Sequence, residues 1–124
     1  MKYKLTVRRN PQNPAAAVKL YATPVGNGKV SQKEIAAEIV GMSSLARGDV
    51  ANVIDSLLDV VSKYLLMGKS VSLGELGTLR ISFSSEGAAT EDEFNVNKIS
   101  GVRVVFLPSS ALRKAIGDIK FEKV

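Results

Sequence analysis

Apolar residues along this chain change their spacing several times, and each spacing predicts a different element. Near the start, Tyr3, Leu5 and Val7 alternate with polar residues, which is the period of a half-buried β-strand. A second alternation over residues 18–23 predicts another strand, and the Asn-Pro steps within residues 9–14 predict the loop between the two. Residues 1–29 are therefore expected to form a β-ribbon with a basic outer face.

Two helical patterns follow. Ser31-Gln-Lys-Glu34 fits a capping box, in which each side chain binds the other residue's backbone N–H, and Gly41 ends the short helix that it starts. A longer helix is predicted between Ala46, which offers no capping side chain, and Gly68. Its apolar face, at i, i+3, i+4 and i+7 spacing, consists of Val50, Val53, Ile54, Leu57, Leu58, Val61 and Leu65.

The second half of the chain predicts a small sheet and a short helix. Residues 74–77 contain two glycines and read as a turn, while residues 84–100 are polar and irregular. We expect strands at 71–73, 78–83 and 102–107, a short helix at 111–116, and either a terminal strand or a docked tail at 119–121.

Two blocks of this sequence resemble the HU/IHF histone-like bacterial DNA-binding proteins. Val71–Leu79 (Val-Ser-Leu-Gly-Glu-Leu-Gly-Thr-Leu) is similar to the family's V-x-L-x-G-F-G-T-F, and Val105–Arg113 is similar to its A-F-x-x-x-x-A-L-[KR]. The basic N-terminal extension resembles the HU-HIG subgroup, in which HU is fused to other domains. The resemblance implies an α+β fold: two N-terminal helices, a three-stranded antiparallel sheet and a short C-terminal helix, with an added N-terminal β-ribbon.

This resemblance also implies a domain division and an intertwined homodimer. Residues 1–29 would be the basic ribbon, and residues 30–124 the HU-like DNA-binding and dimerisation domain. Two long helices would cross and pool their apolar faces, since one amphipathic helix on a small sheet has too little interior to bury them. The implied dimer core is Val50, Val53, Ile54, Leu57, Leu58, Val61, Leu65 and Phe106.

The stretch that corresponds to the family's DNA-wrapping arm departs from the family pattern. The family's arm is rich in arginine and has an Arg-Asn-Pro tip, whereas residues 84–98 carry four acids, one base and no proline. Ser82, Ser84 and Ser110 align with basic residues of the family. Thr90-x-x-Glu93 fits a capping box and predicts a helical turn. Because affinity for DNA comes largely from cations on phosphates, groove-wrapping by this arm is not expected.

Positive charge gathers elsewhere. The chain has a net charge of +5, and residues 1–29 hold six bases and no acid. Arg9-Asn10-Pro11-Gln12 repeats the residue types of the family's arm tip at the opposite end of the chain. One interpretation is a ribbon that takes over DNA contact, and the other is a solvated strand face. The candidate DNA contacts, each of which is also explicable as surface charge, are Lys2, Lys4, Arg8, Arg9, Lys19, Arg80, Arg103, Arg113 and Lys114.

The composition argues against an enzyme. The chain has no cysteine and no histidine, and no motif indicates a cofactor, a metal site or a small-molecule substrate. No signal peptide or membrane segment is evident, so a cytoplasmic protein is expected. The resemblance to the HU/IHF proteins implies a place in the bacterial nucleoid. The leading hypothesis is a non-enzymatic, sequence-tolerant protein that contacts double-stranded DNA phosphates as a homodimer. The alternative is an HU-derived dimerisation or protein-interaction module that has lost DNA binding.

Overall fold

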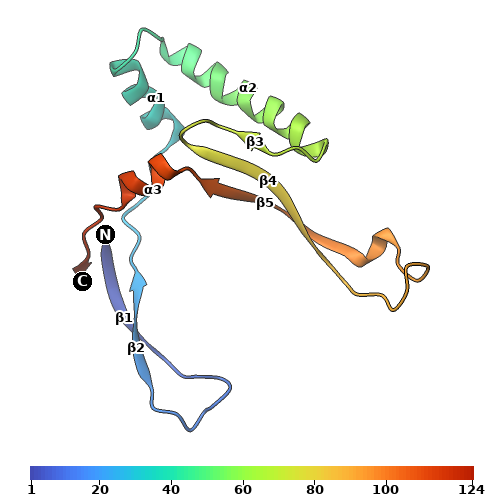
Figure 1. Ribbon diagram of the computed structural model, residues 1–124. Coiled ribbons are helices and arrows are strands. Elements are labelled where there is room, and N and C mark those ends of the chain that lie inside the picture. Colours follow the sequence, from blue (N-terminus) through green and yellow to red (C-terminus); the bar gives the residue numbers. More distant parts are fainter.

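Three helices and two small sheets form an open, branched α+β molecule in the computed structural model, which describes residues 1–124 (Figure 1). One sheet has the strand order β2-β1-β6 and the other β3-β4-β5. The helices are α1 (Gln32–Gly41), α2 (Arg47–Leu66) and α3 (Ser110–Ile116). The strands are β1 (Lys2–Arg8), β2 (Lys19–Pro24), β3 (Val71–Ser72), β4 (Gly77–Ser85), β5 (Ile99–Pro108) and β6 (Glu122–Lys123).

The two N-terminal helices begin as the sequence predicts. At α1 the capping box is complete, because the Glu34 N–H lies 3.2 Å from Ser31 Oγ and the Ser31 N–H lies 2.7 Å from Glu34 Oε2. At α2 only half of the arrangement forms. The Asp49 carboxylate accepts the Ala46 N–H at 3.0 Å, but Ala46 has no side-chain acceptor to return the bond.

The β4–β5 hairpin is longer than the sequence pattern indicates. Both strands continue into the stretch expected to be irregular, with Ser84 paired to Ser100 and Ser85 to Ile99. The pattern missed this extension because the outer hairpin is exposed on both sides, so no apolar alternation marks it. A register shift lies just inside, where Gly101 adopts φ +64°, as in a β-bulge that bends a strand. A 3₁₀ helix at Val96–Lys98, also unforeseen, precedes β5.

Two residues hold the turn before β4 in place. Gly77 packs closely against β5, and Ser109 joins the turn to α3. Gly77 has φ +149°, and a Cβ added there would come within 2.6 Å of Phe106 Cε2. Ser109 Oγ donates to the Glu75 carbonyl and accepts the Leu112 N–H at 3.1 Å, which caps α3. The glycine of the HU-like block is thus required by close packing as well as by the turn.

The N-terminal ribbon is built as expected, but it has a third strand. β1 and β2 pair antiparallel from Tyr3↔Pro24 to Arg8↔Lys19. The last strand lies at 122–123 and not at the expected 119–121, and it pairs parallel to β1. Its register is fixed by the Val124 N–H, which lies 3.0 Å from the Tyr3 carbonyl. The polar pair Glu122 and Lys123 gave no strand signal, because backbone pairing alone places it. Both ends of the chain therefore lie side by side (Figure 1).

The single chain has almost no core. Only Ala36, Val50, Val61 and Gly77 are buried. The accessible surface is 10490 Å², whereas a compact monomer of 13.2 kDa exposes about 6,400 Å². Part of the excess comes from the two projecting hairpins, and part from apolar side chains that have nothing packed against them.

Candidate nucleic-acid interface

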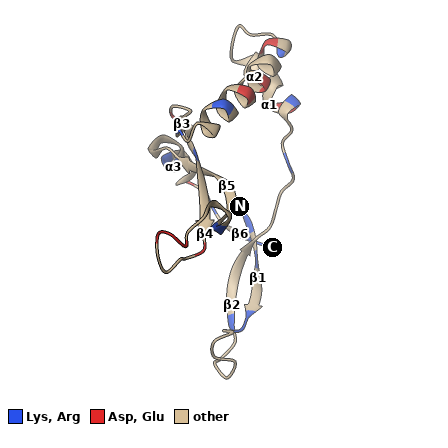
Figure 2. Cartoon of the chain, turned by 90° about the vertical axis from the view of Figure 1, so that its right-hand side faces the viewer, with Lys and Arg blue, Asp and Glu red and all other residues tan.

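The ribbon has one basic face. Lys2, Lys4 and Arg8 alternate along β1 and therefore share a side of the sheet, and Lys19 joins them from β2 as the direct partner of Arg8. All four are exposed. Figure 2 shows Lys and Arg spaced along β1 and β2, on a hairpin that projects from the rest of the chain. The sequence-predicted ribbon cations are thus brought together on one surface, which we call the ribbon basic face.

Arg8 and Lys19 form the most charged point of this face. Like charges directly opposite one another destabilise a pair of strands, so their placement favours an anion between or above them. The Arg8 guanidinium also lies 5.9 Å from the centre of the Tyr21 ring, within the range of a cation–π contact. Tyr21 is 47% exposed beside Arg8, so its ring is a flat surface on which a base can lie.

A hollow of about 440 Å³ opens where the ribbon turns. Arg8, Arg9 and Lys19 line it together with the turn residues. Asn10 holds the turn, since its Oδ1 accepts the Gln12 N–H at 3.0 Å. Arg9 therefore lies with the other two cations around one concave surface of a size that admits a phosphate group.

A second pair of cations lies on the β3-β4-β5 sheet. Arg80 faces the same side as Ser82, whose cross-strand partner is Arg103, so the two arginines are diagonal neighbours. Arg103 Nη1 donates to Ser84 Oγ at 3.2 Å and to the Gly101 carbonyl at 3.3 Å. Ser84, which replaces a basic residue of the family, thus positions the neighbouring arginine. No sequence signal reveals this role.

The remaining candidates lie on α3. Arg113 and Lys114 are exposed in its last turn, where positive charge also favours the helix dipole. A structural role is therefore sufficient to explain them. The nine candidates form three groups, on the ribbon, on the sheet and on α3.

The tip of the β4–β5 hairpin is acidic. Glu86, Glu91, Asp92 and Glu93 gather in its loop, where Figure 2 shows a continuous run of acidic residues. The predicted turn forms with the Glu93 N–H 3.3 Å from Thr90 Oγ1. This hairpin has the place of a DNA-wrapping arm but the wrong charge for a polyanion.

The apolar face of α2 divides in two. Val50 and Val61 are buried within the chain, and Ile54 and Leu65 are half-buried. Val53, Leu57 and Leu58, with Phe106 of β5, are exposed although they are expected in a dimer core. Val60 and Tyr64, which the predicted apolar face did not include, are also exposed. With Val53 and Leu57 they form a series at i, i+4, i+7 and i+11, which is typical of helices that cross another helix. We call these four exposed residues the α2 stripe: Val53, Leu57, Val60 and Tyr64.

Comparison with known proteins agrees with this architecture. The family model described as "HU domain fused to wHTH, Ig, or Glycine-rich motif" (HU-HIG) matches residues 1–123. A crystal structure of a proposed bacterial DNA-binding protein from Bacteroides vulgatus ATCC 8482 is similar, with a TM-score of 0.63 and 22% identity. The match covers 99% of this chain and 47% of that one. No curated protein sequence matches at a significant level.

The fold is thus an α+β fold of the HU-like family, and the matched residues include the β1–β2 ribbon. The chain belongs to the HU-HIG family, as its HU-like blocks and its basic N-terminal extension together predict. None of its helices is both long and apolar enough to cross a membrane.

Proposed function

We propose that this chain is a non-enzymatic, sequence-tolerant DNA-binding protein that works as a homodimer in the bacterial nucleoid. The observation that carries this proposal is the ribbon basic face, where Arg8 and Lys19 stand directly opposite each other beside Tyr21. Such a pair of like charges is stabilised when a phosphate lies across it. Family membership and the description of the similar crystal structure point to the same ligand.

The homodimer follows from the exposed apolar surface. A helix that leaves Leu58 68% exposed and Val53 59% exposed has not completed its core. In the arrangement we propose, the α2 helices of two chains cross, and the excess accessible surface is covered. The HU/IHF topology provides such a crossing, with two sheets forming a saddle.

DNA contact would then be made mainly through phosphates. Arg80 and Arg103 would face the duplex from the saddle, and the ribbon would supply the remaining cations. The acidic β4–β5 tip would turn away from the duplex, so bending would be weaker than in relatives with basic arms. Contacts to phosphates carry no sequence information, which is why we expect tolerance of sequence.

A salt series tests the site. In the ribbon variant, Lys2, Lys4, Arg8 and Lys19 are changed to Gln. Each lost phosphate contact makes the slope of log K against log[salt] shallower by about 0.9. The control changes an equal number of cations that lie outside the three candidate groups and do not contact the α2 stripe: Lys29, Lys33, Arg47 and Lys98 to Gln. We expect a shallower slope and weaker binding for the ribbon variant, and a small change for the control.

A deletion of residues 1–29 is a poorer test, because it leaves β6 without its partner strand. If the salt-dependence slopes of the ribbon variant and the wild type are equal, the ribbon does not contact DNA.

The alternative is a dimerisation or protein-interaction module without DNA binding. The acidic tip and the three serines at positions 82, 84 and 110, which align with basic residues of the family, favour it. In that case, duplex DNA at low salt would form no complex with the wild-type protein, while the homodimer would persist.

A further inference from the structure

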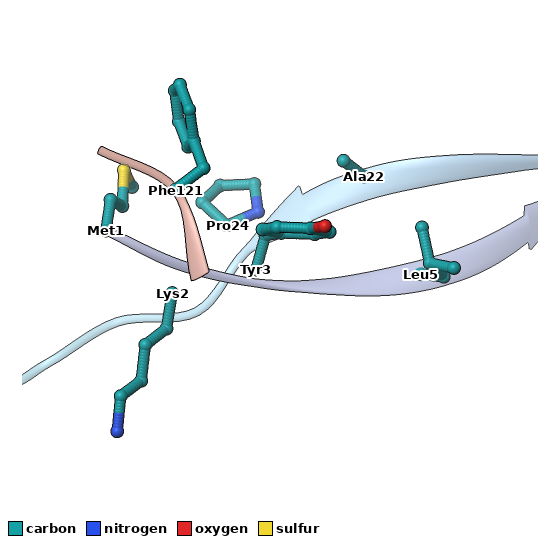
Figure 3. Close-up of a pocket in the computed structure, with 7 residues that line it drawn as sticks. All are labelled: Met1, Lys2, Tyr3, Leu5, Ala22, Pro24 and Phe121. Carbon is teal, nitrogen blue, oxygen red and sulfur yellow. The ribbon is translucent and has the colours of Figure 1, made fainter. Parts of the chain in front are cut away.

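The side of the β2-β1-β6 sheet away from the cations is apolar and open. Alternation in β1 and β2 places six side chains on it. Four of them (Tyr3, Leu5, Ala22 and Pro24) line a groove of about 650 Å³ together with Met1, Lys2 and Phe121. Figure 3 shows Met1 and Phe121 beside Pro24 and Tyr3, whereas Lys2 points away from them. We call the six residues the ribbon apolar face: Tyr3, Leu5, Val7, Leu20, Ala22 and Pro24.

This face has no cover within the chain. Leu20 is 62% exposed, Val7 60% and Leu5 44%. The ribbon projects away from α2 and from the β4–β5 hairpin in both views, so a dimer formed through α2 leaves this face open (Figures 1 and 2). Contiguous apolar patches on soluble proteins mark interaction sites.

We propose that the ribbon apolar face packs on the same face of a second copy and so joins one homodimer to the next. Packing through a two-fold axis matches apolar side chains with apolar side chains. The two sheets would lie about 10 Å apart. Both basic faces would then point outward, which keeps their like charges apart and leaves them free for an anionic partner.

The size of the face supports a weak contact between dimers. Strands of six residues span about 20 Å, and two strands side by side are about 10 Å wide. Each face therefore covers about 200 Å², and the contact buries a total of roughly 400 Å², well below the roughly 1,200 Å² at which weak interfaces end and stable ones begin. Such a contact cannot replace the α2 crossing, but it can form between dimers held close together.

Cooperative assembly is the consequence, and this part rests on the proposed function. Each homodimer has two ribbons, so a two-fold contact at each one extends into a row of dimers. Duplex DNA would supply the high local concentration that a weak contact needs. Bound dimers would then cluster on long DNA rather than scatter at random.

Sedimentation at rising protein concentration without DNA tests the contact. We expect the wild type to form species larger than its dimer. The double variant Leu5→Ser, Leu20→Ser should stay at the dimer mass, or need at least about tenfold higher concentration to associate. The control Val96→Ser removes a 76% exposed apolar side chain from the other hairpin and should behave as wild type.

Both ribbon positions are exposed, so folding of the double variant is expected to be preserved and is checked by circular dichroism. A wild type that shows no larger species at any concentration overturns the inference, as does equal behaviour of the double variant and the control. Neither readout needs DNA. A wild type that binds DNA but does not cluster on it would count against this contact alone, and a wild type that does not bind DNA would count against the proposed function.

Discussion

Leu58 gives the sharpest test of the homodimer. It lies on α2 with 68% of its side chain exposed in the single chain. If the chain works alone, truncation to alanine removes methyl groups that already contact water. The free energy of unfolding would then change by no more than about 0.5 kcal/mol, as for ordinary surface substitutions.

If Leu58 is buried in a dimer, Leu58→Ala lowers the free energy of unfolding by a much larger amount. Leu→Ala in a packed core costs about 2–5 kcal/mol, and a two-fold dimer contains the site twice. The dimer therefore loses about 4–10 kcal/mol. Since about 1.4 kcal/mol corresponds to a tenfold change, the Kd of Leu58→Ala should rise at least about a thousandfold. The two cases are separated by far more than experimental error.

Sedimentation equilibrium and thermal unfolding over a range of protein concentrations measure this effect. The wild-type Tm should rise with concentration, because association stabilises the folded state by mass action. Leu58→Ala should dissociate at concentrations where the wild type is dimeric. The control Asp59→Ala, on the polar face of α2, should leave the dimer unchanged. A monomeric wild type, or a Leu58→Ala protein that matches the control, would refute the reasoning.

Further substitutions test the fold by denaturant unfolding. Gly77→Ala should lower the free energy of unfolding by about 2–4 kcal/mol through backbone strain and its clash with Phe106. The control Gly87→Ala, with open space around it, should change the free energy of unfolding by less than about 0.5 kcal/mol. Equal effects of the two substitutions would contradict the packing described. Ser109→Ala should lower the free energy of unfolding by about 1–2 kcal/mol through loss of the α3 cap. Ala46→Ser should raise it by about 1 kcal/mol by capping α2, and no gain would show that this cap does not limit stability.

The helices and the ribbon strands were predictable because their sequence signals are local. The capping box at Ser31, the spacing along α2 and the alternation of β1 and β2 all depend on neighbours a few residues away. The HU-like blocks added the antiparallel order of β3, β4 and β5. The prediction of the HU-HIG family, which rested on the basic N-terminal extension beside these blocks, is confirmed.

What the sequence missed depends on distant partners. The β6 pairing joins residues about 120 positions apart and has no apolar pattern to reveal it. Ser84 read as a lost cation, yet it holds Arg103 across the hairpin. The exposure of Val60 and Tyr64 depends on how α2 is rotated about its own axis relative to its sheet, and this rotation is known only from the structure. The assignment of nine cations to DNA stays a prediction.

The pairing of β6 with β1 sets an order of events during synthesis. β1 leaves the ribosome before the HU-like segment does, but the Tyr3 carbonyl finds its partner only when Val124 has been made. The HU-like segment lies between them and can fold in the meantime, since chains acquire structure from the N-terminus as they emerge. Completion of the ribbon sheet would therefore report that translation has passed residue 124, and a truncated product would keep an unfinished, adhesive ribbon edge.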